Sequence, residues 1–387
     1  MKILIEQKGI DLGVSLVNEK DSVLAYQDSP NGKFGPEELI VTPVQHQKAT
    51  VIVRPLDDDA NAQTGKFSIH ITPYEPEKID WSKPRLLSVK AMREDIDLLR
   101  KIREKTDSGL YRYKTKSQTD SSYSAAISKT NKPLAVLDFY KILLELDDFE
   151  GSCHNSMTLP QPVTAYLPLE KGFFPYYLKN IDGHLVVNES GGKIPLGSRI
   201  VTIDGMSDAV IMNRFYKYLP TDGYNRTAKA RFSGEGSFGW RFPVEFGFRD
   251  SFAIAYSLPG SSEVKIVNEN SISITDKRAH FANLHSMPFD KIISPDDNPK
   301  YSFGKIDQKT ALLNFRVFDM AANADDPAFA TFSRYLDSIF VQMKTDGTKN
   351  LIIDIRDNPG GNDPNYEQVF TYLTDASFRE NTSAHII

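Results

Sequence analysis

The chain has 387 residues, enough for two or three domains that each bury a core of their own. Its 40% hydrophobic and 25% charged content is usual for a globular protein, and its net charge of −5, with Lys and Arg scattered, argues against nucleic-acid binding. No apolar run approaches the roughly 18 residues of a membrane-spanning helix, and the single cysteine, Cys153, rules out an internal disulfide.

The first 74 residues alternate short apolar runs with loop-forming stretches, which is typical of the strands of a β-sandwich. The next stretch, EPEKIDWSKP, reads as a linker. Helical periodicity follows, because Met92, Ile96, Leu99 and Ile102 recur on one face of AMREDIDLLRKIREKT. Two further helices are expected in SQTDSSYSAAISKT and in LAVLDFYKILLEL.

From about residue 163 to 275 the pattern returns to strands. A hairpin is expected around Asp182-Gly183, and IPLGSRIVTIDGMS predicts a strand and a tight turn. The polar, Gly-rich segment 220–242 is expected to be a loop, and the aromatic run WRFPVEFGF that overlaps its end reads as a strand.

Beyond residue 300 strands and helices alternate. TALLNFRVF predicts a strand, Asp326-Pro327 opens a helix with proline at its first position, and NLIIDIR predicts the next strand. NYEQVFTYL predicts another helix, and TSAHII reads as the start of a further strand. This order indicates an α/β unit with a parallel strand pair and a right-handed crossover.

The stretch LIIDIRDNPGGN, residues 351–362, joins a buried-looking strand to charged residues and a double glycine. In an open α/β sheet ligands bind outside the carboxyl ends of the strands, and glycine lets the backbone approach a ligand closely. Exposed N–H groups there could stabilise an oxyanion. An ordinary strand-to-helix turn explains the spacing equally well.

The motif LIIDIRDNPGG closely resembles the signature of the S41 serine peptidases, the C-terminal-processing and tricorn-like group. The helices at 91–147 with GLYRY between the first two, FEGSCHNSMTLP, IPLGSRIVTIDG and TDGYNRTAK resemble further stretches of that family in the same order. Residues 1–74 resemble the pre-peptidase β-sandwich found beside secreted bacterial peptidases. The resemblance covers nearly the whole chain.

The resemblance implies roles for individual residues. His154 becomes the candidate general base, since an imidazole titrating near pH 6.5 can take a proton from a serine hydroxyl. Gly360 and Gly361 become the candidate oxyanion-hole backbone. For the support residues Asp354, Arg356 and Asn358 we expect a bracing role at that turn, with a simple ion pair and an Asx-turn as the alternative.

The sequence departs from the family in two places. The family usually carries Gly-Asp-Gly-His where this chain has Gly-Ser-Cys-His154, and a single histidine in a sequence is otherwise a surface or core residue. The nucleophilic serine of the family lies on a later strand-to-helix turn, and Ser383 lacks the flanking glycines of such a turn. We therefore nominate no nucleophile in this chain and expect the 387-residue form not to be a competent peptidase.

Four other patterns are weaker. The GEGSFG run at 234–239 lacks the preceding strand of a dinucleotide site, and Asp57, Asp59 and Asn61 are followed by the wrong residues for a calcium loop. His280 and His285 are poorly spaced for zinc. Cys153 next to His154 is badly placed to pair with it, so we expect a buried, inert thiol. No metal or cofactor is implied.

We therefore predict a multidomain α+β protein: a β-sandwich (1–76), a linker and helical segment (77–162), a PDZ-like β segment (163–275) and the first part of an S41-type α/β core (276–387). The resemblance implies serine endopeptidase action on peptide or unfolded protein segments, and a periplasmic or extracellular location. Two alternatives stay open: a non-catalytic peptide-binding pseudo-peptidase, and an adhesion or targeting module that works through the β-sandwich. The oligomeric state is not predicted.

Overall fold

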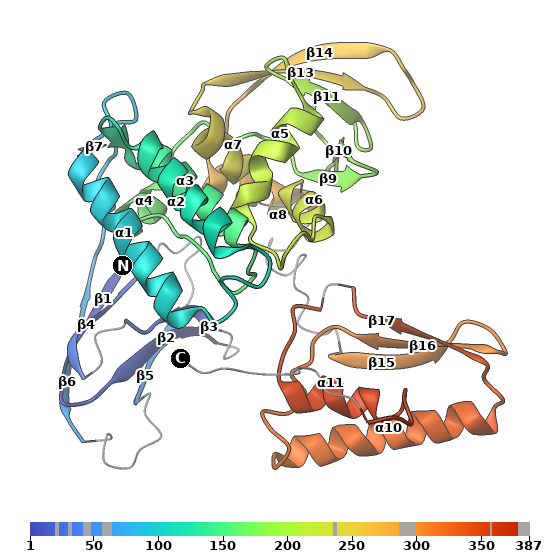
Figure 1. Cartoon of the computed structure of the whole chain (residues 1–387). Helices are drawn as coiled ribbons and strands as arrows, with labels where there is room; N and C mark the ends of the chain where they lie inside the picture. Colours follow the sequence, from blue (N-terminus) through green and yellow to red (C-terminus); the bar gives the residue numbers. More distant parts are fainter. Residues whose placement is uncertain are drawn as a thin grey trace. The chain divides into compact units, whose positions relative to one another are not determined.

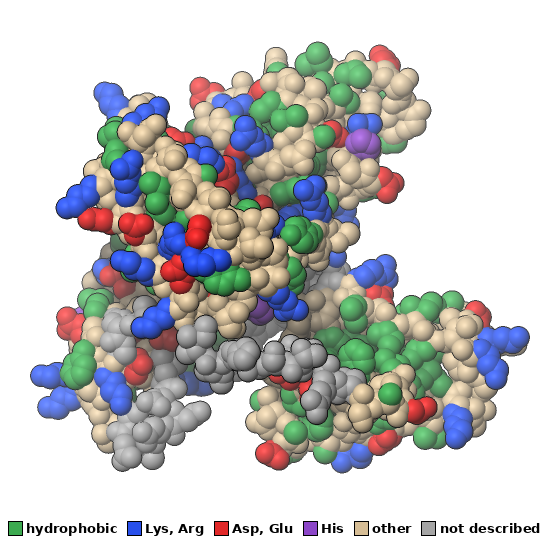
Figure 2. Space-filling model, viewed as in Figure 1, with side chains coloured by type: hydrophobic (Ala, Val, Ile, Leu, Met, Phe, Trp, Pro, Cys, Tyr) green, Lys and Arg blue, Asp and Glu red, His purple; other side chains and the backbone are tan. Residues whose placement is uncertain are grey.

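The computed structural model describes residues 1–19, 23–29, 33–41, 48–55, 64–234, 238–285, 299–356 and 358–377. The chain divides into two compact units, Met1–Phe289 and Asp290–Ile386, which we call the first and second unit and describe separately. No described helix is both long and apolar enough to span a bilayer. On the visible face, Lys and Arg side chains alternate with Asp and Glu rather than forming a basic stripe (Figure 2).

The first unit begins with two three-stranded antiparallel sheets, ordered β4-β1-β6 and β3-β2-β5 (Figure 1). Ile3 and Ile5 of the first sheet and Leu12, Val14 and Leu16 of the second share one buried core. Two sheets around one core form the sandwich that the strand pattern predicts. The strands are β1 (Lys2–Lys8), β2 (Leu12–Asn18), β3 (Val23–Gln27), β4 (Phe34–Ile40), β5 (Ala49–Pro55) and β6 (Lys66–Thr72).

Three helices follow, α1 (Val89–Thr106), α2 (Lys116–Lys129) and α3 (Val136–Glu150), with the short strands β7 (Leu86–Leu87) and β8 (Leu134–Ala135). Their starts are set by local hydrogen bonds: Ser88 accepts from Ala91 N–H at the start of α1, and Thr115 forms a capping box at the start of α2. Met92 and Ile96 of the predicted α1 face are buried in the core between the helices, whereas Ile102 is 47% exposed.

The rest of the first unit is a sheet ordered β14-β13-β11-β10-β9, with β12 on β11, and the helices around it. The predicted hairpin at Asp182-Gly183 is the β9–β10 turn. The label PDZ-like for this segment stays a prediction. Its elements are α4 (Gln161–Tyr166), η1 (Leu167–Leu169), β9 (Leu178–Ile181), β10 (His184–Val187), β11 (Arg199–Ile203), β12 (Met206–Ser207), α5 (Asp208–Phe215), η2 (Tyr216–Tyr218), α6 (Thr227–Ser233), α7 (Phe238–Phe246), β13 (Ser251–Ser257), β14 (Val264–Asn270) and α8 (Ile274–His285).

The segment 220–242 corrects one expectation, because it contains helix α6 and the start of α7 rather than a loop, and the aromatic run is helical rather than a strand. Phe238, Phe242 and Phe246 recur every four residues, and each ring contacts the next. Phe238 and Phe242 are fully buried in the core of this sheet. Helical spacing of buried aromatic rings therefore outweighed their preference for strands.

The second unit is a three-stranded sheet ordered β15-β16-β17 with α10 and α11 on one face (Figure 1). β15 (Tyr301–Lys305) is antiparallel to β16 (Thr310–Phe315), and β16 is parallel to β17 (Asn350–Asp354). α10 (Pro327–Thr345) connects the parallel pair, and Asp326 caps it by accepting from Ala328 N–H at 2.9 Å. α11 (Asp363–Phe370) follows β17, so the predicted strand and helix order is confirmed.

Candidate functional site

The double-glycine turn lies directly after β17, at the carboxyl end of the parallel pair. Asn358 organises it: its Nδ2 donates to Phe315 O at 3.1 Å, and its Oδ1 accepts from Gly360 N–H at 2.8 Å. Gly360 has φ +108°, a conformation that favours glycine. The Asx-turn offered as the alternative for Asn358 is therefore present, and it occupies the Gly360 amide.

Gly361 is held by the main chain of Phe318. Phe318 N–H donates to Gly360 O at 2.8 Å, and Asn362 N–H donates to Phe318 O at 2.7 Å. A Cβ on Gly361 would lie 2.0 Å from Phe318 O, so no side chain fits. Within the described part of the chain nothing accepts from the Gly361 amide. Of the two predicted amides, only that of Gly361 is available to a ligand.

Asp354 and Arg356 form an ion pair at the end of β17. Arg356 Nε donates to Asp354 Oδ1 at 2.9 Å, and Arg356 N–H donates to the same oxygen at 3.0 Å. These hydrogen bonds favour the carboxylate and hold the pKa of Asp354 well below its usual range. The Arg356 side chain is 85% exposed, so the pair lies at the surface of the second unit.

His154 lies in the first unit, in the turn that follows α3. Gly151 ends α3 in the left-handed conformation at φ +72°, and its C=O accepts from Gly223 N–H at 2.9 Å. Tyr113 contacts the ring of Tyr224 and accepts from its hydroxyl at 3.0 Å. Three stretches quoted for the family resemblance, GLYRY, FEGSCH and TDGY, are therefore brought together around His154.

The residues on either side of His154 are fixed by side chains. Cys153 N–H donates to Asp222 Oδ1 at 3.0 Å. Asn155 Nδ2 donates to Asp107 Oδ2 at 2.8 Å and to Glu150 Oε2 at 3.4 Å. The His154 ring itself is exposed and forms no hydrogen bond or ion pair with any described residue. The backbone is held while the imidazole stays available.

A buried polar cluster supports this turn. Arg103 donates through Nε to Glu150 Oε2 at 3.0 Å and through a terminal nitrogen to Asp147 Oδ1 at 2.9 Å. Tyr123 OH donates to Glu150 Oε1 at 2.7 Å. Burial raises the pKa of both carboxyls above the usual range, although Arg103 opposes the shift. The cluster joins α1, α2 and α3 at the point where the His154 turn begins.

The predicted residues fall into two groups. His154 belongs to the first unit, and Gly360, Gly361 and their three support residues belong to the second. Cys153 is exposed, which corrects the expectation of a buried thiol, because it lies in a surface turn instead of on α3. Ser383 and the candidate calcium loop with Asp57, Asp59 and Asn61 lie outside the described residues.

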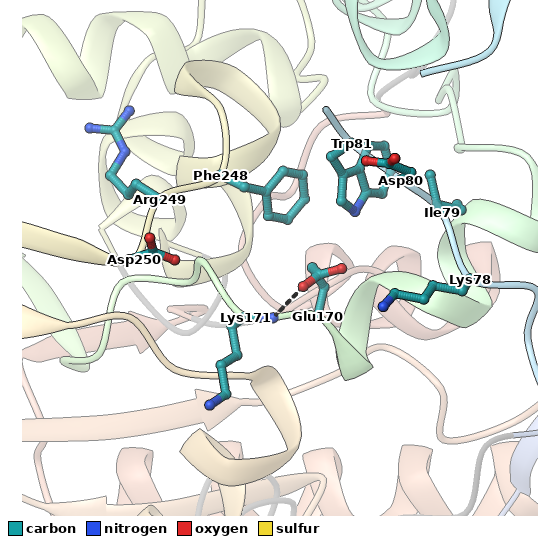
Figure 3. Close-up of a pocket in the computed structure, with 9 residues that line it drawn as sticks. All are labelled: Lys78, Ile79, Asp80, Trp81, Glu170, Lys171, Phe248, Arg249 and Asp250. Atoms are coloured by element: carbon teal, nitrogen blue, oxygen red, sulfur yellow. Dashed lines mark hydrogen bonds between the residues drawn. The ribbon is translucent and has the colours of Figure 1, made fainter. Parts of the chain in front are cut away.

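Among the residues that the structure describes, no group of three or more His, Cys, Asp or Glu is arranged to hold a metal ion. His280 is an exposed residue of α8. A cavity of about 680 Å³ in the first unit is lined by the stacked rings of Trp81 and Phe248 and by charged residues of both signs (Figure 3). None of the predicted site residues lines this cavity.

Comparison with known proteins gives the family of the second unit. Residues 316–385 match the model of Peptidase family S41. This part of the chain is S41 peptidase-like. The match includes β17, the double-glycine turn and all five predicted residues of that turn. No curated protein matches the chain in a sequence comparison.

Two solved structures are similar to the chain at low identity. The crystal structure of mature CPAF is 14% identical with a TM-score of 0.39, covering 70% of this chain and 56% of the CPAF chain. The crystal structure of a CPAF mutant is 15% identical with a TM-score of 0.40, covering 70% of this chain and 57% of the other. This chain thus spans little more than half the length of either structure.

The sequence prediction missed the anchors of His154. Asp222 is 69 residues from Cys153, and Asp107 is 48 residues from Asn155. Each is an aspartate in a polar loop, a pattern that occurs at many solvated turns. The one available signal was the family resemblance of GLYRY and TDGYNRTAK, which marked both segments without assigning a role to Asp222 or Asn155.

Proposed function

We propose that this protein is a serine-type endopeptidase of the S41 kind, acting on peptide or unfolded protein segments by acyl transfer. The observation that carries the proposal is the turn after β17, where the unpaired Gly361 amide lies within the segment that matches the peptidase family. Export to the periplasm or the cell exterior is part of the proposal, and cell fractionation tests it.

In the proposed reaction a serine hydroxyl attacks the peptide carbonyl carbon, and His154 takes the hydroxyl proton. The carbonyl oxygen becomes an oxyanion, and the Gly361 N–H donates a hydrogen bond to it. The intermediate collapses when the imidazolium returns the proton to the leaving amine, which gives an acyl-enzyme that water then hydrolyses. We assign no serine among the described residues to the attacking role.

The Gly360 amide has a different proposed role. Since it donates to Asn358 Oδ1, it would hold the turn in shape, and Asn358 would brace it through Phe315 O. Asp354 and Arg356 would brace the strand end through their ion pair. The proposal therefore divides the five residues of the turn into one donor to the substrate and four supports.

The proposal is tested on the protein produced from its natural gene, with a fluorophosphonate probe that labels activated serines. We expect labelling of one serine outside residues 1–387, and loss of most labelling in His154→Ala. Labelling of a serine within residues 1–387 would show that the site is assigned wrongly. If no serine is labelled and unfolded protein is not cut, the peptidase proposal fails.

One observation favours non-catalytic peptide binding as a second candidate. β14 is an edge strand of its sheet, and its Val264 and Ile266 side chains are 52% and 74% exposed. A peptide could add to this edge as a further strand. Binding of unfolded peptide without cleavage, abolished by a proline at Val267 in the middle of β14, would support this candidate over the first.

A further inference from the structure

The turn that carries His154 combines a held backbone with a free side chain. Cys153 and Asn155, its two neighbours in sequence, are each fixed by hydrogen bonds to residues from other parts of the first unit. His154 is exposed, and its ring bonds to no described residue. A turn that served only to connect α3 to α4 would not need anchors on both sides of one residue.

The anchor on the N-terminal side is Asp222. Its Oδ1 accepts from Cys153 N–H at 3.0 Å, and next to it Gly223 N–H donates to Gly151 O at 2.9 Å. The two bonds pair the His154 turn with the segment before α6. The approach is close, because a Cβ on Gly151 would lie 3.3 Å from the Gly223 main chain. Asp222 therefore fixes the direction in which the chain enters His154.

The anchor on the C-terminal side is Asn155, which is 9% exposed. Its amide nitrogen reaches Asp107 at the end of α1 and Glu150 at the end of α3. Glu150 is in turn held by Arg103 and Tyr123, so α1, α2 and α3 all contribute to this anchor. Asn155 fixes the direction in which the chain leaves His154.

We propose that Asp222 and Asn155 are positioning residues for His154: they act through the turn backbone to hold the imidazole where a reacting hydroxyl can reach it. This inference rests on the proposed function, since it assumes that His154 is the base. A displacement of about 1 Å in a catalytic group can reduce the rate by up to roughly 100-fold, so the loss of either anchor has a measurable effect.

The first measurement does not depend on activity. Hydrogen exchange of amides 152–155 is compared between the wild-type protein, Asp222→Ala, Asp222→Asn and Asn155→Ala. We expect faster exchange in both alanine variants and near wild-type exchange in Asp222→Asn, because the asparagine Oδ1 still accepts from Cys153 N–H. Asp307→Ala is the matched control, since Asp307 Oδ1 accepts from Lys309 and Thr310 N–H in the second unit. Unchanged exchange of the α3 amides shows that each variant is folded.

The second measurement is the rate of fluorophosphonate labelling in the same variants, with His154→Ala beside them. We expect at least a tenfold fall in the two alanine variants and recovery in Asp222→Asn. If His154→Ala abolishes labelling but Asp222→Ala and Asn155→Ala do not reduce it, the positioning inference is wrong and the proposed function stands. If His154→Ala labels normally, the proposed function loses its base, whatever the exchange data give.

Discussion

The two halves of the candidate site are built by different means. In the second unit the double-glycine turn is held mainly by its own main chain and by Phe318, and it offers a backbone amide. In the first unit the His154 turn is held by side chains from α1, α3 and the segment before α6, and it offers a side chain. The comparison teaches that a backbone donor tolerates no added atoms, whereas a side-chain donor depends on a network of distant partners.

The largest expected effect is from Gly361→Ala. The added methyl group would overlap Phe318 O and C at 2.0 and 2.1 Å, and main-chain atoms cannot avoid it by changing rotamer. We expect the second unit to lose more than about 4 kcal/mol of stability, seen as faster hydrogen exchange in β16 and β17. Gly304→Ala is the control, since a Cβ on Gly304 meets no atom within 4 Å. Equal exchange in the two variants would contradict the clash.

The next effect is from Arg103→Met in the other half of the site. The variant leaves the carboxyls of Asp147 and Glu150 buried without their cation, which costs about 3 to 5 kcal/mol for a buried pair. The control is Arg100→Met on the same helix, where a more exposed pair with Glu104 is worth about 1 kcal/mol or less. Urea denaturation of the first unit measures both. A smaller loss in Arg103→Met than in Arg100→Met would show that the cluster does not support the turn.

A smaller effect concerns pH. Burial raises the pKa of Asp147, so the folded protein binds this proton more tightly than the unfolded chain. The contribution of Asp147 to stability is therefore fully present below about pH 4 and is lost as the pH rises through the raised pKa. We expect the stability of the wild type relative to Asp147→Asn to fall from pH 4 to pH 7. Asp138→Asn, an exposed acid on the same helix, should show no such trend.

The smallest effect has the opposite sign. Hydrogen bonds from Arg356 lower the pKa of Asp354, so any stability that this pair contributes is present above about pH 4 and is lost as the pH falls through the lowered pKa. We expect Arg356→Ala to move the Asp354 carboxyl titration, followed by carbon NMR, back toward its ordinary value. Arg356→Lys keeps the charge without the guanidinium fork and should give an intermediate result. An unchanged titration in Arg356→Ala would remove the ion pair from the description of this turn.

The second half of the site could be predicted from the sequence because its parts are local. Strand, Asn358 and both glycines lie within twelve consecutive residues, and the alternating order beyond residue 300 placed them at a strand end. The sequence could not show that Asn358 occupies the Gly360 amide, since that depends on side-chain geometry within the turn. The availability of Gly361 alone is a result of the structure.

The first half could be predicted only in outline. The helices and the hairpin followed from periodicity and turn residues, but Asp222, Asp107 and Asn155 meet through tertiary contacts that no local pattern records. The aromatic run in α7 was predicted as a strand because propensity was applied without the spacing of Phe238, Phe242 and Phe246. Cys153 was expected inside because isolated cysteines usually are, whereas a turn pinned at the surface exposes it.

The glycine pair also affects how genetic screens of this protein would be interpreted. A substitution at Gly361 abolishes a donor and a fold together, so an inactive mutant recovered there says nothing about catalysis. A Cβ on Gly360 meets no atom within 4 Å, so a mutant at that codon suffers only backbone strain from φ +108°. Neighbouring codons would therefore give alleles of different kinds, a null at Gly361 and a temperature-sensitive allele at Gly360.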